Sequence, residues 1–193
     1  MSFITGTQVE LLYALPAAIT KNTYTTIAAI SGVAGTNTVC SIPPGWLLND
    51  NPNPLTRSLS LCAMGTIANT AAATFAMNIN VNPTVATTTN NLAVNTAYTP
   101  LASNTTGWFL DVWFTCTAFA TSTFTLQANG RIRYENVATG GAPSTGAQCG
   151  WFQGTWTGLD PRVQQYVEIF GTWSASNAAN TTTLQQMFLW GLN

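Results

Sequence analysis

Two consecutive runs of the sequence decide the fold. Residues 108–118 read Trp-Phe-Leu-Asp-Val-Trp-Phe-Thr-Cys-Thr-Ala, and residues 124–134 read Phe-Thr-Leu-Gln-Ala-Asn-Gly-Arg-Ile-Arg-Tyr. In both runs every even position is apolar or glycine, whereas the odd positions carry most of the polar residues. Because successive side chains of a β-strand point to opposite faces, this period of two predicts two strands that each bury one face. The short connection at 120–122 predicts that the strands form an antiparallel hairpin.

The register of this hairpin follows from keeping the two apolar faces together. That pairing sets Leu110 opposite Ile132, and on the other face it sets Asp111 opposite Arg131. A cross-strand ion pair at that position stabilises a sheet by about 0.2–1 kcal/mol. A slip of one residue would separate the charges and turn both apolar faces outward. The same register places Phe114 opposite Ala128.

The same alternation predicts two further hairpins. One joins residues 57–67 to residues 73–81, and the other joins residues 167–173 to residues 182–192. In the last hairpin Leu184, Phe188 and Trp190 are expected to face the core. Trp108 and Trp173 are also expected there. Weaker strand candidates lie at 8–15, 23–30 and 38–42.

No segment shows a sustained helical stripe, so the sequence predicts an all-β protein. About eight strands, arranged largely as hairpins over one core, indicate an antiparallel β-sandwich with a jelly-roll-like architecture. We expect one domain over residues 1–193, with an N-terminal arm at about 1–15 and long loops at 83–106 and 136–158. Loops of that length are usually functional or contact a partner.

The scarcity of charge limits what the protein can bind. Only five Lys and Arg and six Asp and Glu occur among 193 residues, so charged residues make up 6% of the chain. Nucleic-acid binding needs clustered basic residues, and five scattered ones do not supply them. No run of 18 apolar residues and no secretory signal is evident, so we expect no membrane partner and assembly in a host cytoplasm.

The residues needed for catalysis or metal binding are largely missing. The chain has no histidine, which is the usual general base and the commonest metal ligand. The spacing of Cys40, Cys62, Cys116 and Cys149 matches no zinc motif, and we expect four buried thiols. We therefore predict no catalytic residues, no cofactor, no metal site and no enzymatic activity. Substitution of Asp111 or Glu168 would test for an overlooked hydrolase.

Large apolar residues at outward positions are the remaining signal. Phe109 and Trp113 fall on the outward face of the first strand, beside Asp111. Phe170 and Met187 likewise fall opposite the core parity in the last hairpin. Such residues usually mark a second layer or a subunit interface, so we take these four as interface candidates.

Three other aromatic residues complete the candidate interface. Trp151 and Trp156 lie in the predicted loop at 136–158, where they could anchor a partner, stack on a sugar or pack on the sandwich. Phe3 lies in the N-terminal segment, which could reach a neighbouring molecule.

Several of these segments resemble small virion proteins of tailed bacteriophages. A Trp-rich strand and a closing hairpin of the form Thr-Trp-small-Ser…Asn-Thr recur in such proteins. The resembling segments are residues 57–66, 74–81, 107–115, 126–134 and 167–193. The resemblance implies a jelly-roll decoration (cement) protein of the head, or a minor structural protein of head or tail, and it supplies no catalytic residues.

From this resemblance and the uncharged surface, we expect a capsid decoration protein on the outside of the virion. It would form a homo-oligomer, with a trimer favoured, and bind the major capsid protein through apolar and Thr-rich surface. The alternative is a tail-fibre, head-fibre or minor tail protein that binds a receptor or glycan through Trp151 or Trp156.

Overall fold

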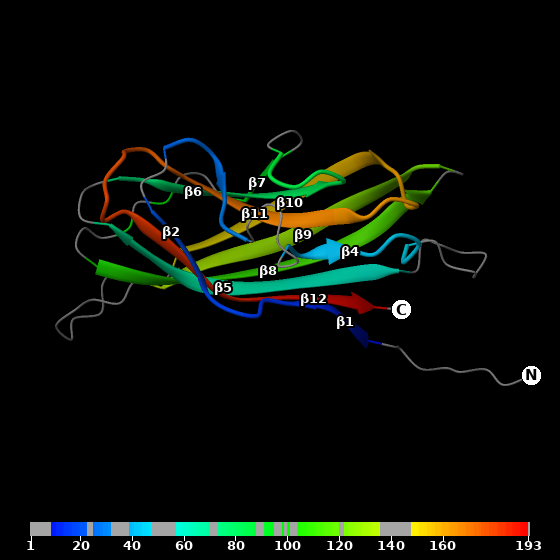
Figure 1. Ribbon diagram of the computed structural model, residues 1–193, viewed down its shortest axis with the longest axis horizontal. Coiled ribbons are helices and arrows are strands. Elements are labelled where there is room, and N and C mark those ends of the chain that lie inside the picture. The colour runs from blue at the N-terminus through cyan, green and yellow to red at the C-terminus, as the bar shows by residue number, and fades with distance from the viewer. Residues whose placement is uncertain are drawn as a thin grey trace, which may run out of the picture.

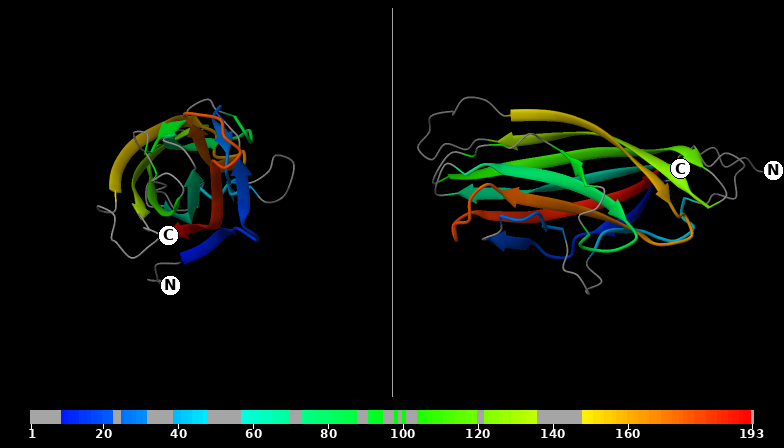
Figure 2. Two further views of the ribbon diagram at one scale, coloured as in Figure 1. Left: turned by 90° about the vertical axis from the view of Figure 1, so that its left-hand side faces the viewer. Right: turned by 90° about the horizontal axis from the view of Figure 1, so that it is seen from above.

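The protein is a sandwich of two antiparallel β-sheets, as the alternation predicts, and the described residues contain no helix. Figure 1 shows the sheets stacked face to face, and the end-on view in Figure 2 shows them curving around one interior. That interior holds the apolar core. The structure is a computed structural model that describes residues 9–22, 25–31, 39–47, 57–69, 73–87, 91–94, 98, 100, 104–119, 122–135 and 148–192.

The larger sheet has seven strands in the order β1-β12-β5-β8-β9-β10, and β2 pairs with the same edge of β12 as β1. The strands between its two edges are β12, β5, β8 and β9, which are among the longest. The bounds are β1 Val9–Ala14, β2 Ile19–Asn22, β5 Ser58–Asn69, β8 Asn104–Phe119, β9 Phe124–Glu135, β10 Gln148–Leu159 and β12 Thr181–Leu192.

The smaller sheet has five strands in the order β3-β11-β6-β7, and β4 also pairs with β11. Three of these strands contain only two residues, so β6 and β11 make most of the layer. The bounds are β3 Ala28–Ala29, β4 Ser41–Ile42, β6 Phe75–Asn82, β7 Leu92–Ala93 and β11 Gln165–Trp173.

The first predicted hairpin is confirmed in its register. Strands β8 and β9 pair antiparallel, with Leu110 opposite Ile132 and Asp111 opposite Arg131. Phe114 is also opposite Ala128, as predicted. The even-numbered residues of β9 are buried and its odd-numbered residues from 129 to 135 are exposed, so the alternation sorts the two faces.

The other two predicted hairpins are wrong, although their strands exist. Strand β5 belongs to the larger sheet and β6 to the smaller one, and β11 and β12 are likewise divided between the sheets. Each of these strands pairs elsewhere: β5 with β12 and β8, and β6 with β11. Two strands that face one core from opposite sheets bury the same alternate positions as a hairpin does, so periodicity cannot separate the two arrangements.

The predicted long loops and N-terminal arm contain regular structure. β8 begins at Asn104 inside the predicted 83–106 loop, and β10 occupies Gln148–Leu159 at the end of the predicted 136–158 loop. Val9–Ala14 of the predicted arm form the edge strand β1.

A β-bulge in β12 reverses the predicted facing of its second half. The pairing with β5 shifts register between Leu184 and Gln186. Met187 and the next-but-one residue, Leu189, therefore turn into the core, where both are fully buried. Phe188 and Trp190 turn outward and are only half-buried. The expectation that Met187 lies at an interface is wrong for this reason, and so is the expectation that Phe188 and Trp190 lie in the core.

Part of the outer side of the smaller sheet, around Phe170 and Glu168, is covered by the chain itself. Phe170 alternates with the core residue Ile169 yet is only 1% exposed. Glu168, on the same side, is 2% exposed and accepts a hydrogen bond from the Ala86 amide (2.9 Å). Phe170 therefore belongs to a second internal layer and offers no surface to a partner.

Burial of Glu168 predicts a pH dependence of stability. Loss of hydration raises the pKa of this carboxyl, and the bond from Ala86 only partly opposes the shift. A raised pKa means that the folded state holds the proton more tightly than the unfolded state, so stability falls as pH rises through that pKa.

We therefore expect Glu168→Gln, which keeps an oxygen for the Ala86 amide, to raise the melting temperature at pH 7 by at least about 2 °C. The gain should shrink toward zero near pH 4, measured by calorimetry across that range. A gain that is constant with pH, or that grows in acid, would contradict this assignment.

Candidate functional site

The outward face of the larger sheet is built by alternate residues of five neighbouring strands. Along β8 these residues are Gly107, Phe109, Asp111 and Trp113. The register carries each of them across the sheet: Trp113, for example, is level with Ser60 of β5 and Asn129 of β9. The face therefore carries aromatic, amide and charged side chains in fixed rows.

A shallow groove of about 350 Å³ lies at one part of this face. Two tryptophans from different strands flank it: Trp113 of β8 is 51% exposed and Trp151 of β10 is 79% exposed. Trp151 is level with Arg131 and Asp111, so the two tryptophans are about 10 Å apart across the strands and about 7 Å along them. The groove is lined by Asp111, Trp113, Asn129, Gly130, Arg131 and Trp151.

The predicted ion pair forms the floor between the two tryptophans. Arg131 Nη2 lies 3.5 Å from Asp111 Oδ2, with 54% and 22% of the respective side chains exposed. A pair this exposed adds little to stability, so its guanidinium and carboxylate are available as a hydrogen-bond donor and acceptor for a ligand. Gly130 is needed beside them, because a Cβ there would lie 2.5 Å from the Phe152 ring and 2.7 Å from the Asp111 carbonyl oxygen.

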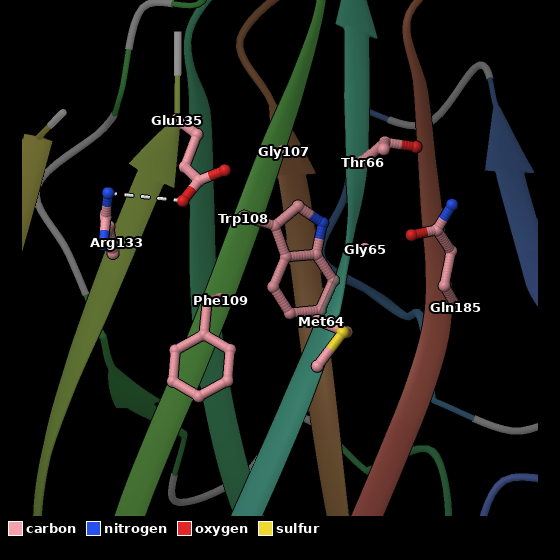
Figure 3. A pocket seen from close by; sticks show the side chains of 9 residues that line it. All are labelled: Met64, Gly65, Thr66, Gly107, Trp108, Phe109, Arg133, Glu135 and Gln185. Carbon is pink, nitrogen blue, oxygen red and sulfur yellow. Dashed lines mark ion pairs between the residues drawn. The ribbon is translucent and has the colours of Figure 1, made fainter. Parts of the chain in front are cut away.

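A second hollow of about 440 Å³ adjoins the groove along the same strands. In Figure 3 the ion pair of Arg133 with Glu135 stands on one side of it, and Thr66 and Gln185 stand on the other. The two charged side chains are 3.3 Å apart and about half exposed. Gln185 is the residue left unpaired by the bulge in β12. The hollow is lined by Met64, Gly65, Thr66, Gly107, Trp108, Phe109, Arg133, Glu135 and Gln185.

Three of the seven predicted interface residues share this face. Phe109 lines the second hollow, and Trp113 and Trp151 flank the groove. Trp156, by contrast, is 3% exposed and packs against Phe114 with ring centroids 5.8 Å apart. Its expected role as an exposed anchor is wrong, because Trp156 lies in strand β10 opposite the core residue Leu126 and so faces the interior. Phe170 and Met187 are buried as described above, and Phe3 lies outside the described residues.

Sequence reasoning overlooked two groups of residues on this face. Asn129, Arg133 and Glu135 were seen only as the polar side of a strand, although their alternation already placed them beside Phe109 and Asp111. The outward position of Trp190 and Phe188 depends on the bulge, for which the sequence gives no local signal. Their rings stack at 6.4 Å beside the exposed residues Val9 and Leu11 of β1.

The cysteines differ from the expected set of four buried thiols. Cys40 and Cys116 are buried, Cys62 is half-buried and Cys149 is exposed, and all four are free. Burial raises the pKa of the first three thiols, so they are protonated at neutral pH. Within the described ranges, no three Cys, Asp or Glu residues lie close enough together to hold a metal ion. No helix there is long and apolar enough to cross a membrane.

The groove combines apolar faces with balanced charge. Each tryptophan offers a broad ring for stacking, and Asp111, Arg131 and Asn129 offer both donors and acceptors between the rings. The positive and negative charges cancel within the groove. This arrangement suits an uncharged ligand that has an apolar face and several hydroxyl groups.

The likeness of this chain to known proteins is structural and distant. No protein-family model matches the sequence, and no curated protein matches it. Among solved structures, the chain is similar to the CBM2 module of the evolved Dit protein of Lactobacillus casei BL23 phage J-1. The identity is 11%, the match covers 97% of each chain and the TM-score is 0.34.

The different exposures of Trp151 and Trp156 predict a small effect of one substitution on stability and a large effect of the other. Trp151→Ala should change the free energy of unfolding by no more than about 0.5 kcal/mol, because most of that side chain is already in water. Trp156→Ala should lower it by about 3–5 kcal/mol, because it leaves a cavity beside Phe114. Urea denaturation of both variants measures the difference, and equal losses would show that β10 is placed wrongly.

Proposed function

We propose that this protein is a non-catalytic saccharide-binding module of a virion and that the groove between Trp113 and Trp151 is its binding site. The exposure of two tryptophans on either side of a charge-balanced floor is the observation that carries the proposal. The resemblance of the strand motifs to small virion proteins of tailed phages supports the virion setting. A tail or fibre protein that attaches to glycan on a host surface would account for the groove and for the resemblance to virion proteins.

The chemistry of a pyranose matches the groove on two counts. The C–H groups on one side of the ring form an apolar face that stacks on an indole, and this contact buries apolar area. The ring hydroxyls both donate and accept hydrogen bonds. The Asp111 carboxylate accepts, the Arg131 guanidinium donates and the Asn129 amide does both.

The groove also has the rigidity that a weakly binding polar surface needs. Trp113, Asp111, Arg131 and Trp151 all project from paired strands, so their backbones are held by the β8–β9 and β9–β10 ladders. A site on regular strands loses less conformational entropy on binding than a site on a loop. Several copies on one particle would multiply a modest single-site affinity through avidity.

A glycan array tests the proposal directly. The wild-type protein should bind a defined subset of saccharides, and Trp151→Ala and Trp113→Ala should each lower the affinity roughly tenfold or more. Trp190→Ala is the matched control, because it removes an indole from the same face outside the groove. Retained binding by both groove variants, or no binding by the wild type, would overturn the proposal.

Decoration of a capsid as a homo-oligomer is the second candidate, and one observation favours it. Val9 and Leu11 are 58% and 47% exposed, and they adjoin Trp190 and Phe188 at the edge of the same face. An apolar strip of this kind is typical of a protein contact.

If the strip binds the major capsid protein, Leu11→Asp should release the protein from purified particles while Trp151→Ala should not. The bound fraction should change little between low salt and about 1 M NaCl, where charges are screened within about 3 Å. Release by salt, or release by the groove variant alone, would exclude this candidate.

A further inference from the structure

The groove and the second hollow lie end to end along the same two strands. On β8 the groove uses Trp113 and Asp111, and the hollow uses Phe109 and Gly107. These four residues alternate along one strand, so they all point to the same side of the sheet. The distance from Trp113 to Gly107 is six residues, or about 20 Å.

On β9 the same two sites use the residues directly opposite. Asn129 and Arg131 face the groove, and Arg133 and Glu135 face the hollow, level with Phe109 and Gly107. The groove and the hollow share no lining residue, but the outward rows of β8 and β9 run from one site to the other, and we call these rows the track. In Figure 3 the Phe109 ring lies beside the hollow, at the end away from Gly107 and Glu135.

The chemical content of the groove is repeated in the hollow. The groove holds an aromatic ring with a carboxylate–guanidinium pair, namely Trp113 with Asp111 and Arg131. The hollow holds Phe109 with Arg133 and Glu135. Each site carries one positive and one negative charge, so neither selects a charged ligand, and each offers a donor and an acceptor beside a ring.

We propose that the protein binds an extended, uncharged saccharide chain that runs along β8 and β9 and occupies both sites at once. This inference rests on the proposed function and specifies its ligand as a chain of pyranoses. A repeated set of contacts suits a repeating polymer, since successive units present the same faces and hydroxyls. A straight track along a strand further requires an extended chain, which equatorial β-1,4 linkages give.

Gly107 provides a variant that closes the hollow and leaves the fold intact. A Cβ at this position would meet nothing closer than 3.8 Å, the nearest atoms being Glu135 Cβ and Oε2. Valine is favoured over glycine in a strand, so Gly107→Val should fold at least as well as the wild type. Its two methyl groups would occupy the floor between Phe109 and Glu135. Thr117→Val, on the exposed end of β8 outside both sites, is the matched control.

The experiment is isothermal titration with cello- and chito-oligosaccharides of two to six units. For the series that binds, wild-type affinity should rise by about tenfold or more once the chain can span both sites, because the second contact is then intramolecular. Gly107→Val should remove that rise and leave the affinity for the disaccharide unchanged. Thr117→Val should bind as the wild type does, and neither variant should melt below the wild type.

Failure of this inference is distinguishable from failure of the proposed function. If affinity does not depend on chain length, or if Gly107→Val has no effect on the longest chain, the hollow is not a subsite, although Trp151→Ala can still abolish binding. If neither series binds but the array selects another glycan, the chain class is wrong and the groove assignment stands. If Gly107→Val changes the oligomeric state without changing saccharide affinity, the hollow is a protein contact and the inference is overturned.

Discussion

The antiparallel pairing of β8 with β9 is the constraint on which the rest of the structure depends. These strands lie inside the seven-stranded sheet, and every residue from Gly107 to Cys116 has a partner in β9. Their register sends Leu110 and Ile132 into the core and Asp111 and Arg131 outward. A slip of one residue would bury two arginines and expose the core, so the stability of the sandwich and the layout of its outer face are fixed by one choice.

Four of the few charged residues of the chain form ion pairs on the outer face of the larger sheet. Two of the three ion pairs found among the described residues lie on the outer face of the larger sheet, one in each hollow. Each ion pair joins one positive and one negative side chain, so the two sites offer hydrogen-bonding groups but carry no net charge. Recognition by such a surface depends on stacking and directed hydrogen bonds and is only weakly sensitive to salt. A polar, uncharged polymer is the ligand that this chemistry favours.

The sequence was sufficient for the parts of the fold in which neighbouring strands pair and one face is clearly polar. The β8–β9 register and the outward positions of Phe109 and Trp113 follow from alternation alone. Alternation failed where strands pair across long distances, since β5 and β6 bury alternate residues against one core from opposite sheets.

Alternation also failed where both faces are apolar. Residues 187–190 read Met-Phe-Leu-Trp, so neither parity is preferred, and the bulge near Gln185 decides which side turns inward. The β8 side of the site was therefore predictable from the sequence, and the β10 side was not. Trp151 was identified as a candidate aromatic anchor, but its place next to Arg131 depends on the pairing of β9 with β10. Residues 136–158 were expected to form a loop, so that pairing was not predicted.

The central claim is that saccharide lies on the outer face between Trp113 and Trp151, and the indole N–H signals of the seven tryptophans report on it directly. Nuclear magnetic resonance of protein labelled with ¹⁵N at the indoles should be recorded during titration with the saccharide that the array selects. The account predicts saturable shifts of the Trp113 and Trp151 signals, with the signal of the core residue Trp173 unchanged. Shifts confined to Trp190 or to the buried tryptophans would contradict it.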